Sequence, residues 1–127
     1  MAAYWTLVCD ADDPARAADF WALALGYVPE PGFDKPDNAS IVDPAGVGPT
    51  IGFVKVAAGK TVKNRLHLDI RVAGRGPWDV AERGRLIGAK VPELVAAGAT
   101  VVREAHAGEN LDYVMMQDPE GNEFCVA

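Results

Sequence analysis

A chain of 127 residues, half of them hydrophobic and about a quarter charged, has the composition of one compact globular domain with an adequate core. Its formal net charge of −6 disfavours nucleic-acid binding, because contacts with phosphates require clustered Lys and Arg side chains. The two cysteines, Cys9 and Cys125, are too few and too distant in sequence for a disulfide scaffold or a zinc knuckle, so we expect reduced thiols.

The apolar stretches of the chain are too short to span a bilayer. Residues 1–4 also lack the basic and hydrophobic regions of a secretory signal. We therefore expect a cytoplasmic protein with no membrane partner.

The first half of the chain predicts one helix and four strands. Residues 4–10 are rich in β-formers and aromatic side chains, which is typical of a strand. Asp13 and Pro14 then supply a helix N-cap and a proline in the first turn, and apolar residues recur every three or four positions until Gly26. Short strands, separated by turns rich in Pro, Gly and Asp, are expected at residues 27–30, 39–42 and 50–56.

The second half predicts the same order of elements. A strand at residues 65–72 precedes a helical stretch at residues 78–97. Proline inside a helix costs about 3 kcal/mol, so Pro92 predicts a kink or a division of this helix near Val91. Further strands are expected at residues 100–103, 113–117 and 123–126.

The two halves therefore form a weak internal repeat with the order βαβββ. An Asp-Pro-x-Gly turn precedes the last strand of each half, at residues 43–46 and 118–121. Neither unit could bury its apolar face alone, so we expect an α+β fold of two modules around a shared half-barrel cleft. The modules are expected at about residues 1–60 and 61–127 of one domain.

Side-chain alternation predicts which residues face the cleft. One face of the strand at residues 65–72 carries three ionisable groups, which would be costly in a dry core and are expected to line a wet concavity or a polar interface. These are His67, Asp69 and Arg71. On the last two strands, the same alternation places Tyr113 on one face of the first, and Glu123 together with Cys125 on one face of the second.

Each of these residues also has an ordinary structural interpretation. His67 either contacts a ligand or acts as a general base, or it is a buried histidine satisfied by Asp69 or a backbone carbonyl. Cys125 is either a reactive thiol or a small hydrophobe at the end of a strand. Glu123 either orients a substrate or is solvated, and Tyr113 belongs either to the core or to an aromatic-walled cleft.

The element order and two segments of the chain resemble the vicinal oxygen chelate superfamily. The segments are Asn-Arg-Leu-His-Leu-Asp-Ile at residues 64–70 and Asp-Pro-Glu-Gly-Asn-Glu-Phe-Cys-Val at residues 118–126. This superfamily comprises glyoxalases, bleomycin-resistance proteins, fosfomycin-modifying enzymes and extradiol dioxygenases. The resemblance covers nearly the whole chain, and the subgroup that the chain resembles is the glyoxalase-like proteins of unassigned function. It therefore specifies the fold better than the reaction.

The resemblance also implies where a metal would bind. Enzymes of this superfamily typically hold a divalent metal with a histidine from the first strand, a histidine from the fifth and a glutamate from the last. These positions fall on Thr6, His67 and Cys125, so one ligand of three is retained. A thiolate ligand from Cys125, or Glu123 after a register slip of one residue, is the remaining route to a metal site.

The resemblance therefore implies a homodimeric small-molecule binding protein of the bleomycin-resistance type, without a catalytic metal or other cofactor. The candidate catalytic residues are His67 and Glu123, which would also hold a metal if one is bound. The candidate ligand-binding residues are Thr6, Asp69, Arg71, Tyr113 and Cys125.

Two other functions stay open at this point. One is a metal-dependent lyase or isomerase of the glyoxalase type, or a related dioxygenase, in which the metal polarises vicinal oxygens of the substrate. The other is a metal-free isomerase or epimerase that uses His67 as its base.

Overall fold

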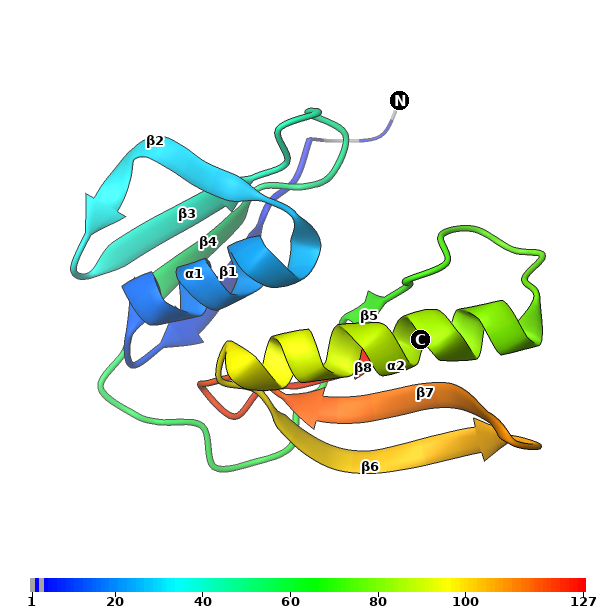
Figure 1. Cartoon of the computed structure of the whole chain (residues 1–127). Coiled ribbons are helices and arrows are strands. Elements are labelled where there is room, and N and C mark those ends of the chain that lie inside the picture. The colour runs from blue at the N-terminus through cyan, green and yellow to red at the C-terminus, as the bar shows by residue number, and fades with distance from the viewer. Residues whose placement is uncertain (1, 3) are drawn as a thin grey trace. The chain divides into compact units, whose positions relative to one another are not determined.

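Each half of the chain folds into one helix and four strands in the order βαβββ, within the part that the computed structural model describes: residue 2 and residues 4–127, with Asp34 as backbone only (Figure 1). The halves form two compact units, residues 1–60 and 61–127, and each unit is an open four-stranded sheet that carries a helix. The predicted α+β class and the repeated βαβββ order are confirmed. Among the described residues, no helix is long and apolar enough to cross a membrane.

The first unit begins with strand β1 and helix α1. Its elements are β1 (Leu7–Ala11), α1 (Pro14–Leu25), β2 (Val28–Lys35), β3 (Asn38–Val42) and β4 (Ile51–Lys55). The strand order is β1-β4-β3-β2, in which β1 runs parallel to β4. The Asp13 carboxylate caps α1 by accepting a hydrogen bond from the Arg16 backbone N–H (3.2 Å), and Gly26 ends the helix in the left-handed conformation at φ 72°.

The second unit has the same topology. Its elements are β5 (Asp69–Ile70), α2 (Val80–Ala96), β6 (Thr100–Ala107), β7 (Asn110–Gln117) and β8 (Glu123–Val126). The strand order is β5-β8-β7-β6, and β5 runs parallel to β8. One face of β7 and β8 is fully buried beneath α2, which leaves the other face free to form a site. The buried side chains on this face are Val114, Met116, Phe124 and Val126.

The repeat is also visible in the two Asp-Pro-x-Gly turns. The carboxylates of Asp43 and Asp118 each accept a hydrogen bond from the backbone N–H two residues later, at 2.8 and 2.9 Å. The backbone carbonyl of each aspartate accepts a bond from the turn glycine, at 2.9 Å in both turns. Gly46 and Gly121 adopt positive φ angles of 71° and 84°, which explains the choice of glycine.

Of the two outcomes predicted for Pro92, a kink or a division of the second helix, the structure rules out the division. Helix α2 runs without interruption from Val80 to Ala96 with Pro92 inside it. Pro92 has no N–H to donate to the carbonyl of Gly88, one turn earlier in the helix. Both residues lie on the exposed side of the helix, where water can bind this carbonyl instead. Ile87 and Leu94 are fully buried on the other side and hold both halves of the helix against the sheet.

The fifth strand is shorter than predicted. Residues 65–72 were expected to be extended, but β5 comprises only Asp69 and Ile70. Strand β8, the neighbour of β5, has four residues. The hydrogen bonds on this side begin at the Leu68 carbonyl, which accepts from the Cys125 N–H, and end at the Val72 N–H, which donates to the Ala127 carbonyl. Residues 65–67 therefore have no strand to pair with among the described residues.

Substitutions at two glycines of α2, Gly84 and Gly88, are expected to have opposite effects on the free energy of unfolding. A Cβ atom at Gly84 would lie 3.2–3.3 Å from backbone and Cβ atoms of Asn110 and Leu111, whereas one at Gly88 would meet only a Leu111 methyl at 3.8 Å. We expect Gly84→Val to lower the free energy of unfolding by about 1–3 kcal/mol through overpacking. Gly88→Ala is expected to raise it by about 0.5–1 kcal/mol, because alanine favours the helix. Urea denaturation of both variants tests the pair, and equal effects of the two would contradict the packing described.

Candidate functional site

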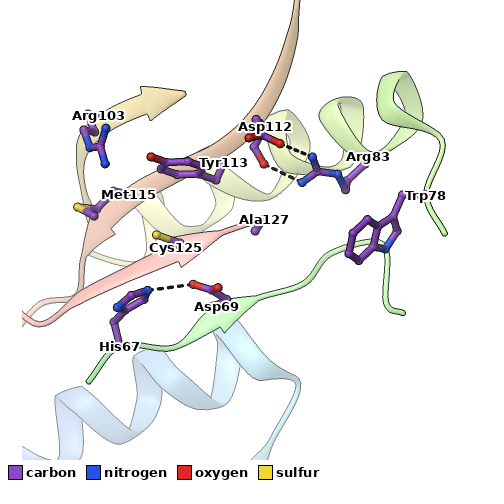
Figure 2. Close-up of a pocket in the computed structure, with 10 residues that line it drawn as sticks. All are labelled: His67, Asp69, Trp78, Arg83, Arg103, Asp112, Tyr113, Met115, Cys125 and Ala127. Atoms are coloured by element: carbon purple, nitrogen blue, oxygen red, sulfur yellow. Dashed lines mark hydrogen bonds and ion pairs between the residues drawn. The ribbon is translucent and has the colours of Figure 1, made fainter. Parts of the chain in front are cut away.

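A cavity of about 450 Å³ lies in the second unit, on the sheet face opposite the one that α2 buries (Figure 2). The strands β5, β7 and β8 supply its floor, because alternate side chains on each strand point away from α2. Its lining residues are His67, Asp69, Trp78, Arg83, Arg103, Asp112, Tyr113, Met115, Cys125 and Ala127. The volume is within the range of small-molecule sites, about 300–1,000 Å³.

The polar side of the cleft contains a histidine and a carboxylate in contact. His67 Nε2 lies 3.3 Å from Asp69 Oδ1, and both side chains are about half exposed to the cleft. Asp69 is held by β5, whereas His67 lies just before the strand begins. A carboxylate in this place orients the imidazole, so that His67 can exchange a proton with a molecule in the cleft.

Cys125 forms part of the floor beside this pair. In the sheet, Cys125 pairs with Asp69 on β5 and with Met115 on β7, and its side chain is buried. Burial raises the pKa of the Cys125 thiol and the negative charge of Asp69 raises it further, while Arg103 and Lys63 act in the opposite direction. Cys125 is therefore protonated near neutral pH and is a poor nucleophile by itself.

This arrangement predicts the pH dependence of Cys125 alkylation. In a Cys9→Ser background, the rate of reaction with iodoacetamide should rise with a midpoint above the ordinary pKa of a free thiol, because only the thiolate reacts. Asp69→Asn should lower the midpoint and Arg103→Gln should raise it, since each removes one of the charges that act on the thiol. A midpoint that neither substitution moves would place these charges away from Cys125.

An arginine and a tryptophan frame one end of the cleft. Arg83, in the first turn of α2, donates to the Asp112 carbonyl (2.7 Å) and to Asp112 Oδ1 (2.5 Å). The Trp78 ring has the Arg71 guanidinium 4.6 Å and the Arg83 guanidinium 5.5 Å from its centroid, and its Nε1 donates to the Gly74 carbonyl (3.0 Å). These contacts fix the Trp78 ring as a wall of the cleft.

The structure brings together four of the seven residues predicted for the site: His67, Asp69, Tyr113 and Cys125 all line the cavity. Arg71 instead stacks on Trp78 and is not among the lining residues. Thr6 belongs to the first unit, so the structure does not place it relative to this cleft. The catalytic or binding role of each residue stays a prediction.

Glu123, predicted in the site, is not among the residues that line the cavity and instead contacts Asn64. Its Oε2 accepts a hydrogen bond from the Asn64 backbone N–H (2.9 Å), and its backbone carbonyl accepts one from Asn64 Nδ2 (3.1 Å). These bonds tie the segment before β5 to the start of β8. Glu123 therefore helps to position the segment that contains His67.

Other lining residues had no clear signal in the sequence. Arg83 and Asp112 are 29 positions apart, and no local pattern predicts their pairing. Arg103 reaches the cleft because of an irregularity in β6, where Val101 pairs with Met116 and Arg103 with Met115. Only Met115 was within reach of sequence reasoning, because it shares a strand face with Tyr113.

The donor atoms in the cleft suit a transition metal. A His67 ring nitrogen, an Asp69 carboxylate oxygen and the Cys125 sulfur all lie within 4.8 Å of one another. Zinc binds nitrogen, oxygen and sulfur ligands at about 2.0–2.3 Å in a tetrahedron, so small side-chain rotations would bring the three donors to one ion. The thiol proton would have to leave when the metal binds.

Comparisons with known proteins agree with this fold. A family model described as a glyoxalase-like domain matches residues 6–127. Among curated proteins, none matches the chain significantly.

Several solved structures are similar over nearly the whole chain. A glyoxalase/bleomycin resistance protein/dioxygenase family enzyme from Burkholderia phytofirmans PsJN has 17% sequence identity and a TM-score of 0.68, with 98% of this chain and 97% of that chain covered. A glyoxalase-related enzyme from Fulvimarina pelagi has 16% identity and a TM-score of 0.66, with coverage of 100% and 88%. The fosfomycin resistance protein FosX from Listeria monocytogenes, in complex with Mn(II) and a dihydroxypropylphosphonic acid, has 9% identity and a TM-score of 0.69, with coverage of 99% and 89%. At these identities the similarity concerns the fold.

Proposed function

The chain belongs to the glyoxalase-like domain family of the vicinal oxygen chelate superfamily, and we propose that its second unit binds a small organic molecule in the cleft beside His67. The observation that carries this proposal is the cavity of about 450 Å³, whose lining combines five ionisable side chains from His, Asp and Arg with five aromatic or less polar residues. This combination is typical of small-molecule sites. A ligand would contact Met115, Tyr113 and Trp78 with its apolar part and His67 with a polar group.

The His67–Asp69 contact also supports an enzymatic role of the isomerase or epimerase type. An imidazole whose partner is a carboxylate can remove a proton from a bound molecule and return it to another position. Asp69 would stabilise the imidazolium that forms and would keep the ring oriented.

A fragment screen followed by ¹H–¹⁵N NMR tests the binding proposal. The expected result is that hits shift amide resonances of Tyr113, Met115 and Cys125, which lie on neighbouring strands of the cleft floor. Resonances of residues buried beneath α2 on the opposite face, such as Ile87, should not move. If no fragment shifts the floor resonances, or if all hits map elsewhere, the proposed function is wrong.

A metal-dependent reaction of the glyoxalase or dioxygenase type is the second candidate, and the donor set of His67, Asp69 and Cys125 favours it. When bound, the metal would polarise an oxygen of the substrate or lower the pKa of a bound water. Glu123 was the metal ligand expected beside His67 from sequence. Its contact with Asn64 makes Asp69 and Cys125 the better partners of His67 in this proposal.

Zinc titration monitored by calorimetry distinguishes the two candidates. For the metal-dependent candidate we expect one zinc ion per chain, and loss of that binding in Cys125→Ser and His67→Ala. His106→Ala is a matched control, because His106 is an exposed histidine of β6 that lies 3.8 Å from Glu104, outside the donor set. Zinc binding that survives both site substitutions would rule out this metal centre.

The homodimer implied by the superfamily resemblance is likewise a proposal. Sedimentation equilibrium of the purified chain tests it directly. A monomer at the concentrations used for ligand binding would contradict it.

A further inference from the structure

The ionisable side chains that line the cleft are not equally satisfied. Asp69 lies against His67, and Arg83 is bound twice by Asp112. Arg103 lies 5.4 Å from the centroid of the Tyr113 ring, and among the described residues no carboxylate is within ion-pair distance of its guanidinium. Arg103 is therefore the one Arg, Asp or His of the cavity lining that has no ion-pair partner among the described residues.

A β-bulge places Arg103 in the cleft. In a regular strand, residues 101 and 103 would point to the same face. Here Val101 pairs with Met116, whose side chain is buried beneath α2, whereas Arg103 pairs with Met115, whose side chain lines the cavity. The extra residue, Val102, therefore turns Arg103 from the α2 face to the cleft face. Bulges commonly redirect a side chain beside a functional site.

The pairing continues across the sheet as one row of side chains. Arg103 on β6 pairs with Met115 on β7, Met115 with Cys125 on β8, and Cys125 with Asp69 on β5. The row therefore has a free cation at one end, two apolar sulfur-containing side chains in the middle, and the His67–Asp69 pair at the other end. Figure 2 shows Arg103 and the His67–Asp69 pair on opposite sides of Cys125.

The two ends of this row carry opposite charges. Arg103 is the cation at one end, and the Asp69 carboxylate lies at the other, with Met115 and Cys125 between them. An anionic group of a ligand would be attracted to the Arg103 end, away from Asp69.

Building on the proposed function, we propose that the cleft takes a small aromatic carboxylate, with its carboxylate group at Arg103 and its ring over Met115 and Tyr113. A guanidinium binds a carboxylate through two parallel hydrogen bonds, which a lysine cannot reproduce. The ring would lie against side chains that offer apolar contact, and its far edge would reach toward His67. Arg103 would thus select ligands that carry a negative charge, whereas His67 would contact the opposite end of the ligand.

Three compounds of one shape and different charge test this inference: naphthalene-2-carboxylate, the neutral naphthalene-2-methanol and the cationic 2-(aminomethyl)naphthalene. Binding is measured from the amide shifts of Tyr113, Met115 and Cys125. We expect the carboxylate to bind at least about tenfold more tightly than the alcohol, because charge-assisted hydrogen bonds from a guanidinium are stronger than neutral ones. The amine should bind most weakly, because Arg103 repels it. Arg103→Gln should reduce the affinity for the carboxylate to that for the alcohol, and Arg103→Lys should restore part of it.

Arg85→Gln is the matched control, because it removes the same charge from an exposed position of α2 where Arg85 pairs with Glu82. It should leave all three affinities unchanged. If the alcohol shifts the floor resonances as strongly as the carboxylate, or if Arg103→Gln has no effect, the inference is wrong while the proposed function holds. If none of the three compounds shifts these resonances, the inference is also wrong, and the fragment screen decides the proposed function separately.

Discussion

Replacing Phe124 with alanine is expected to lower the free energy of unfolding by about 3–5 kcal/mol, the usual cost of removing a buried aromatic ring. Phe124 is 1% exposed and lies on the β8 face that packs beneath α2. Its ring fills the core of the second unit, and the two residues beside it on β8, Glu123 and Cys125, face the other way. The substitution would therefore remove support from the cleft floor without changing a cleft residue.

Urea denaturation followed by far-ultraviolet circular dichroism measures this effect. Phe33→Ala is the control, because Phe33 is 45% exposed on β2 of the first unit and should cost less than about 1 kcal/mol. Because the chain has two compact units, the transition of each variant should also be followed by NMR of residues in each unit. Equal losses for the two phenylalanines would contradict the buried position of Phe124.

Filling the cleft by Met115→Trp is expected to abolish ligand binding while the fold persists. Met115 lines the cavity and is only partly buried, and its neighbours Val114 and Met116 point to the opposite face. A larger side chain at this position would occupy the space in which the ligand is proposed to lie. We expect the dissociation constants of all cleft-binding fragments to rise at least about tenfold, which corresponds to about 1.4 kcal/mol.

Val95→Trp provides the matched control for this substitution. Val95 is 46% exposed on α2, on the other side of the sheet from the cleft. The added indole there should leave fragment binding unchanged and should not lower stability more than Met115→Trp does. If Met115→Trp retains the affinity of the wild-type chain, the ligand site lies elsewhere.

Strand alternation predicted much of the cleft floor correctly. On the segments at residues 113–117 and 123–126, the side chains toward α2 are fully buried, whereas Tyr113, Met115 and Cys125 line the cleft, as alternation predicts. Glu123 is the exception, because it contacts Asn64 instead. The His67–Asp69 contact also follows from spacing, because residues two apart near an extended segment share a face. The resemblance to the vicinal oxygen chelate superfamily is confirmed by the family match over residues 6–127.

Other features depend on long-range pairing that the sequence does not contain as a local pattern. The bulge at Val102 reverses the face of Arg103, and alternation counted from the start of β6 places this side chain on the wrong side. Arg71, predicted in the site, stacks on Trp78 because β5 ends at Ile70 and the chain leaves the sheet. The Glu123 carboxylate accepts a hydrogen bond from the backbone N–H of Asn64, which lies 59 positions earlier in the sequence.

The continuous helix α2 shows a similar limit. Pro92 is unfavourable inside a helix, but the helix continues through it because Ile87 and Leu94, on either side of Pro92 in sequence, are buried against the sheet. Tertiary packing therefore decided the boundaries of this helix.

The most direct test of the proposed ligand site is a crystal structure of the wild-type chain with the tightest-binding hit of the fragment screen. We expect electron density for the compound in the cavity of the second unit, in contact with Met115 and Tyr113 and with a polar group at His67. Density for the compound only at other places, with this cavity filled by water, would contradict the proposal that the cleft is a small-molecule site.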